Sequence, residues 1–140
     1  MINLILLNIF VSTFMLSLIL ITQIVSYPLF LKVNFSNLET YHSDYVKRIS
    51  LIVMPFMMLE LLVALLLLIY LESLQSIFSI ILLIAIFLST YFIQVPIHSK
   101  ITNNTNTLIL KKLINTNWLR TIPWFLKCII SFNILLMEVL

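Results

Sequence analysis

Residues 2–31 read INLILLNIFVSTFMLSLILITQIVSYPLFL and contain no Asp, Glu, Lys or Arg. A helix of about 20 apolar residues, rising about 1.5 Å per residue, crosses the roughly 30 Å hydrocarbon core of a bilayer. Only helices and closed barrels satisfy every backbone polar group in lipid, and barrel strands alternate in polarity over roughly 10 residues. The stretch is longer than such a strand and apolar throughout, so it predicts a transmembrane helix.

The rest of the chain continues this pattern, because 62% of its residues are hydrophobic and only 9% are charged. We expect four spans, over about 4–26, 49–70, 74–96 and 121–138. The connections between them leave no room for a separate soluble domain. The sequence therefore predicts an all-α membrane protein, in which four transmembrane helices form an up-down bundle and residues 1–140 form a single domain.

Lysine and arginine are concentrated in the first and third connections, whereas the second, around residues 71–75, offers Glu72 and no base. Short loops rich in Lys and Arg stay in the cytoplasm. We therefore expect both termini outside and both basic loops inside. The residues that follow this rule are Lys32, Lys47, Arg48, Lys100, Lys111, Lys112 and Arg120. We interpret the net charge of +3 as a signal of topology and of contact with anionic headgroups, and we expect no nucleic-acid partner.

Two segments that follow the first and third spans share a pattern, PLFLKV at 28–33 and PIHSKI at 96–101. In each, a lysine lies four residues after the proline and a β-branched residue comes next. The pattern is consistent with two duplicated helical hairpins related by an axis along the membrane normal. The alternative is that any two hairpins of one topology share such edges.

The third connection contains an amphipathic piece at about 107–117, in which leucines and isoleucines surround Lys111 and Lys112. This pattern predicts a helix that lies in the inner headgroup layer. Trp118 and Trp124 bracket the start of the fourth span, and we expect both to be interfacial anchors.

Glu60 is the most costly residue in the chain, since it falls near the middle of the second span. Counted from the cytoplasmic ends of their spans, Glu60 and Lys127 lie at similar depths, and a lysine side chain can cover the difference. We expect an intramembrane ion pair between them. Two interpretations remain open: a structural link between the second and fourth spans, or a site for a ligand, a proton or a metal.

A second group of polar and aromatic residues lies within a few residues of the predicted cytoplasmic boundary. The two histidines are weak candidates for metal ligands, because neither belongs to a spaced metal motif. The two arginines could hold an anionic head group or a quinone-like ring, or could simply anchor the membrane edge. The candidates for a ligand pocket are Gln23, His42, Tyr45, Arg48, Gln94, His98, Asn117, Trp118 and Arg120.

The runs QVPIH at 94–98 and NWLRTIPW at 117–124 resemble a class of small bacterial four-helix membrane proteins of unknown function. That class is loosely similar to the anthrone-oxygenase-like membrane family, in which a polar-Pro-x-(Asn/His) element closes the third helix and a Trp/Arg element opens the fourth. His98, Trp118 and Arg120 match by position. The resemblance implies a bundle in a bacterial inner membrane, a polar pocket at one membrane face, and oxidation of an aromatic or quinone-like substrate.

No sequence motif names a reaction or a cofactor, and the absence of glycine excludes phosphate-cradling loops. Three functions remain. The first is binding of a hydrophobic ligand or cofactor in a polar pocket at the cytoplasmic face, with oxidoreductase-like chemistry. The second is a non-catalytic accessory subunit of a larger membrane complex. The third is a small proton-coupled transporter, which with four helices would require a homodimer.

Overall fold

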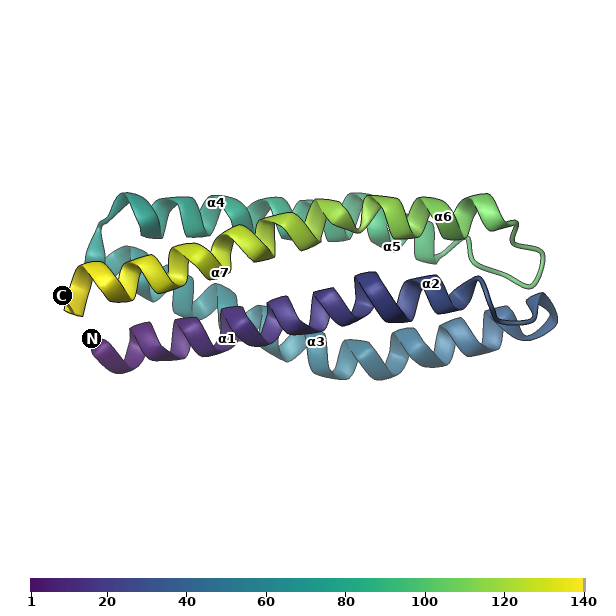
Figure 1. The fold of residues 1–140 in the computed structure, drawn as a ribbon, viewed down its shortest axis with the longest axis horizontal. Helices are drawn as coiled ribbons and strands as arrows, with labels where there is room; N and C mark the ends of the chain where they lie inside the picture. Colours follow the sequence, from purple (N-terminus) through teal and green to yellow (C-terminus); the bar gives the residue numbers. More distant parts are fainter. Residues whose placement is uncertain (140) are drawn as a thin grey trace.

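The computed structural model describes residues 1–139, which are helical except for short connections (Figure 1). Two short π-helical segments, η1 and η2, interrupt the α-helices. In chain order the elements are α1 (Ile2–Ile21), η1 (Thr22–Ser26), α2 (Tyr27–Phe30), α3 (Phe35–Leu71), α4 (Leu74–Ser89), η2 (Thr90–Gln94), α5 (Val95–His98), α6 (Thr107–Thr116) and α7 (Trp118–Val139).

Four helical stretches are long and apolar enough to cross a membrane, namely Ile2–Phe30, Phe35–Leu71, Leu74–His98 and Thr107–Glu138. The predicted all-α class and the four-helix bundle are confirmed. Each predicted span lies inside one of these stretches. The second is much longer than its predicted span, because Asn34 caps a helix that runs unbroken through the first basic segment. The amphipathic piece forms α6.

The helices form a bundle in which α3 and α7 lie on opposite sides. Each of them packs against both α1 and α4. The two termini lie at one end of the bundle together with the turn between α3 and α4 (Figure 1). The connections α2–α3 and α5–α6 lie at the opposite end, which we call the basic end because it contains the seven basic residues named above. A side chain on α3 can therefore meet one on α7 across the centre of the bundle.

The two halves of the chain have the same order of elements. In both, a long helix leads through a π-segment that starts at a threonine (Thr22 or Thr90) into a short helix with proline near its start. Both threonine hydroxyls donate to the carbonyl four residues earlier, at 2.9 Å and 2.8 Å. An asparagine, Asn34 or Asn106, then caps the next helix. This common order supports the hypothesis of duplicated hairpins.

The main core cluster lies between the long helices and includes Val11, Met15, Met57, Leu83 and Trp124. Large apolar side chains on the outer faces are exposed, as expected for surfaces that contact lipid. The expectation that Trp124 is an interfacial anchor is wrong, because its side chain is 1% exposed and turned into the bundle.

Candidate functional site

A cavity of about 620 Å³ lies toward the basic end of the bundle, between α1, α3 and the segment η2–α5. Arg120 and Trp124 of α7 also line it. Its walls divide into an apolar part and a polar part. The apolar part includes Met15, Leu18, Ile19, Val53, Met57 and Trp124, and the polar part includes Tyr27, His42, Tyr45, Gln94, His98 and Arg120. The arrangement suits a ligand with an apolar body and a polar head.

Four of the polar residues form a continuous hydrogen-bonded chain, which we call the relay. Arg120 Nη2 donates to Tyr27 Oη at 3.1 Å. Tyr27 Oη and His98 Nε2 are 2.9 Å apart, and His98 Nδ1 and His42 Nε2 are 2.7 Å apart. The relay thus joins α7, α2, α5 and α3.

One arrangement of the protons gives each hydrogen bond in the relay one donor and one acceptor. Because Arg120 has no acceptor, Tyr27 must accept from it and is then free to donate its own proton to His98 Nε2. A neutral His98 that accepts at Nε2 carries its proton on Nδ1, and donates it to His42 Nε2. In this arrangement every proton in the relay points from Arg120 toward His42.

Arg120 is held by the junction between α6 and α7. Asn117 lies between these two helices, and its Oδ1 accepts from Arg120 Nε at 2.9 Å and also from Nη2. Asn117 Nδ2 donates to Gln23 Oε1 at 2.7 Å, and Gln23 Nε2 donates to the carbonyl of Ile114 at 3.1 Å. Gln23 and Asn117 are thus buried supports of the guanidinium group.

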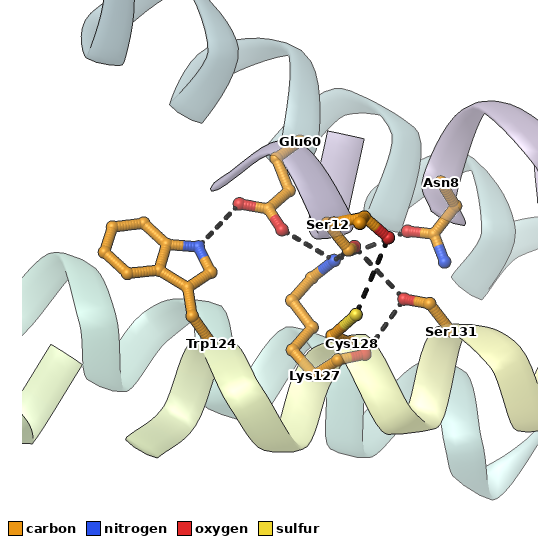
Figure 2. Close-up of polar contacts among 8 residues, drawn as sticks. Asn8, Ser12, Glu60, Trp124, Lys127, Cys128 and Ser131 are labelled. Atoms are coloured by element: carbon orange, nitrogen blue, oxygen red, sulfur yellow. Dashed lines mark hydrogen bonds and ion pairs between the residues drawn. The ribbon is translucent and has the colours of Figure 1, made fainter. Parts of the chain in front are cut away.

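A second polar centre lies deeper in the bundle (Figure 2). Lys127 Nζ of α7 is 3.0 Å from Glu60 Oε1 of α3, and both side chains are fully buried. Trp124 Nε1 donates to the other carboxylate oxygen at 2.9 Å. Lys127 also donates to Ser12 Oγ at 2.7 Å and to Asn8 Oδ1 at 3.4 Å, both on α1. The expected pair is therefore present and ties α3, α7 and α1 together.

The structure divides the predicted pocket residues into three groups. His42, Tyr45, Gln94, His98 and Arg120 line the cavity, and Gln23 and Asn117 support Arg120 from behind. Arg48 and Trp118 are exposed and are not among the lining residues.

Arg48 and Trp118 were expected in the pocket because they lie within a few residues of the predicted cytoplasmic boundary. On a helix, a difference of one or two positions turns a side chain to another face. The link between Trp124 and Glu60 was not predicted, since a tryptophan near a span end is typical of an interfacial anchor.

The residues suited to metal binding do not form a cluster. Within residues 1–139, no three side chains among His, Cys, Asp and Glu lie close enough together to hold an ion. Both ring nitrogens of His98 already have hydrogen-bond partners. The geometry therefore presents His42 and His98 as a hydrogen-bonded pair.

Comparisons with protein-family models, with curated proteins and with solved structures find no match to this chain. The resemblance to anthrone-oxygenase-like proteins stays a prediction. The cavity and its lining are therefore the features of this protein that bear on its function.

Proposed function

We propose that this chain is an integral membrane protein that binds a lipid-soluble ligand, with its basic end facing the cytoplasm of a bacterial inner membrane. The observation that carries the proposal is the cavity, which combines an apolar wall with the polar residues of the relay. The excess of lysine and arginine at the same end supports the orientation.

The route into the cavity supports a ligand that comes from the bilayer. Met54 of α3 and Val95 of α5 both line the cavity, yet they are 59% and 53% exposed on the outer surface of the bundle. In a membrane, that surface contacts lipid. A molecule dissolved in the bilayer could therefore enter between α3 and α5 without crossing the aqueous phase.

Tryptophan fluorescence provides the test, because the chain has two tryptophans and only Trp124 lines the cavity. In a Trp118→Phe background, reconstituted in phosphatidylcholine nanodiscs, dibromostearyl alcohol should quench Trp124 in a saturable way. Val53→Phe, which fills the cavity, should abolish the saturable component. The matched control Ile52→Phe changes an exposed neighbour that is not among the lining residues and should leave it intact. Quenching that never saturates would contradict the proposal.

The relay favours a role in acid–base chemistry over passive storage of a ligand. Its chain of donors and acceptors can pass a proton through His98 between His42 and a group bound beside Tyr27, which lines the cavity. Such a proton path would serve the oxidoreductase-like chemistry that the sequence resemblance implies.

The relay can be tested directly because the chain contains only two histidines. In protein labelled with ¹⁵N-histidine, NMR should show a scalar coupling across the His42–His98 hydrogen bond and a proton on His98 Nδ1. Tyr27→Phe removes the donor to His98 Nε2 and should shift that nitrogen signal while leaving the cavity open. Two fully protonated rings at neutral pH would contradict the relay, since no free acceptor would remain between them.

A further inference from the structure

Arg120 is a buried cation without a carboxylate partner. Its side chain is 8% exposed, and the one ion pair found within residues 1–139 joins Glu60 to Lys127. The guanidinium nitrogens Nε and Nη2 donate to Asn117 and Tyr27. Within residues 1–139 no hydrogen bond to Nη1 is found, and Nη1 is not among the fully buried atoms that lack a partner, so it remains accessible to a ligand in the cavity that Arg120 lines.

A guanidinium group in this position calls for an anion. Arginine stays protonated in proteins, so it cannot escape burial by losing its charge. Buried charges are normally paired, because an uncompensated ion in a medium of low polarity is costly. Asn117 and Tyr27 are neutral and supply dipoles only. The missing negative charge must come from outside the described chain.

Other unsatisfied groups line the same cavity as Arg120. Tyr45 Oη is buried without a hydrogen-bond partner, and its hydroxyl can donate to an anionic oxygen. Gln94 Oε1 is also buried and unpartnered, and can accept from a hydroxyl group of a ligand. The carboxylate in the lining belongs to Glu39, which is exposed and accepts from the backbone N–H of Asn103. The buried part of the cavity is therefore positive.

We infer that the ligand is an amphipathic anion, with a carboxylate or phosphate monoester head on Arg120 and an apolar body that extends toward Trp124. This inference rests on the proposed function, binding of a lipid-soluble ligand, and specifies that the head group of this ligand is negatively charged. Met15 and Tyr27, which both line the cavity, are separated by about 18 Å along their helix at about 1.5 Å per residue, which leaves room for a long chain. A charged head also explains why the cavity lies at the basic end, near the headgroup layer.

The quenching assay described above tests the inference when the head group is varied. Dibromostearic acid, dibromostearyl phosphate and dibromostearyl alcohol carry the same brominated chain. In the Trp118→Phe background, at least one of the two anions should bind about tenfold or more tightly than the alcohol, as expected for a charge-assisted contact. The tighter of the two identifies the head as carboxylate or phosphate, and either result supports the inference.

Variants of the two arginines supply the matched comparison. Arg120→Gln should weaken the preferred anion about tenfold, to the level of the alcohol. Arg48→Gln removes an equal charge from an exposed position that is not part of the cavity lining and should change nothing. If Arg120→Gln fails to fold, the comparison of head groups in the Trp118→Phe background still decides.

The outcomes separate this inference from the proposal beneath it. Saturable quenching with equal affinity for all three compounds would overturn the anionic ligand and leave the lipid-binding cavity standing. An anion preference that survives in Arg120→Gln would also overturn it, because the charge would then be recognised elsewhere. Absence of saturable quenching with every compound would overturn both.

Discussion

The ion pair between Glu60 and Lys127 makes the sharpest prediction about stability. Both side chains are fully buried, and Nζ lies 3.0 Å from Oε1. The indole N–H of Trp124 donates to the second carboxylate oxygen of Glu60, and Ser12 Oγ accepts a hydrogen bond from the ammonium group of Lys127. These contacts favour the structural interpretation of the pair, in which it links opposite helices through the centre of the bundle.

The expected cost of breaking the pair follows from this geometry. At 3.0 Å and an effective dielectric constant of about 20, the attraction between the charges is about 5 kcal/mol. Removing one partner forfeits this attraction and leaves the other charge buried alone, which costs about 3–5 kcal/mol in comparable cases. Glu60→Gln and Lys127→Met should each lower the free energy of unfolding by about that amount. The double variant should lose much less free energy of unfolding than the sum of the two single variants, which corresponds to a coupling energy of about 3 kcal/mol.

Equilibrium unfolding in mixed micelles, followed by helical circular dichroism as the SDS fraction rises, measures all three variants. Glu72→Gln is the control, because this exposed acid in the α3–α4 turn should change the stability by less than about 0.5 kcal/mol. The reasoning would be refuted by additive effects of Glu60→Gln and Lys127→Met. It would equally fail if either single change cost less than about 1 kcal/mol, since the buried charge left behind would then find water or another partner.

Two further predictions concern the buried amides and the orientation of the chain. Gln23→Leu should cost about 2 kcal/mol or more, because it strands Asn117 Nδ2 and a backbone carbonyl. Gln94→Leu should cost about 1 kcal/mol, because it removes one hydrogen bond, from Nε2 to Thr116 Oγ1, and the Thr116 hydroxyl still donates to the carbonyl of Lys112. Unfolding in micelles compares the two, and equal costs would contradict the network. For orientation, the single native cysteine is buried. A membrane-impermeant maleimide should therefore label Asn3→Cys on intact cells and Asn104→Cys only after permeabilisation, and the reverse pattern would invert the proposed topology.

The fold was predictable because its main determinant is the need of long apolar segments to satisfy their backbone hydrogen bonds in lipid. A run without charges, such as 2–31, leaves the backbone no alternative to a helix in lipid. The π-segments at Thr22 and Thr90 were not predictable in the same way. A π-turn adds one residue to a helical turn, and its small energetic difference from an α-turn is decided by packing around it.

The sequence predicted how deep in the membrane each candidate residue lies, but not which face of its helix the side chain occupies. Counting residues along each span placed Glu60 opposite Lys127 and gathered the histidines near one membrane face. It could not separate Arg120 from Arg48, since both lie beside the same boundary. That choice depends on how each helix is rotated, which the partners of its other faces determine.

The two halves of the chain, which share one order of elements, show why one of these arginines is buried and the other is exposed. Arg48 follows the cap Asn34 at the same spacing at which Arg120 follows Asn106. In the first half the helix is continuous and Arg48 remains exposed. In the second half Asn117 separates α6 from α7, and its side chain binds Arg120 on one side and Gln23 on the other. The space between α7 and α1 is thereby filled by a polar network, whereas the cavity lies between α1, α3 and the segment η2–α5. The asymmetry between two similar hairpins, rather than any local motif, thus supplies both the room for a ligand and the charge that would hold it.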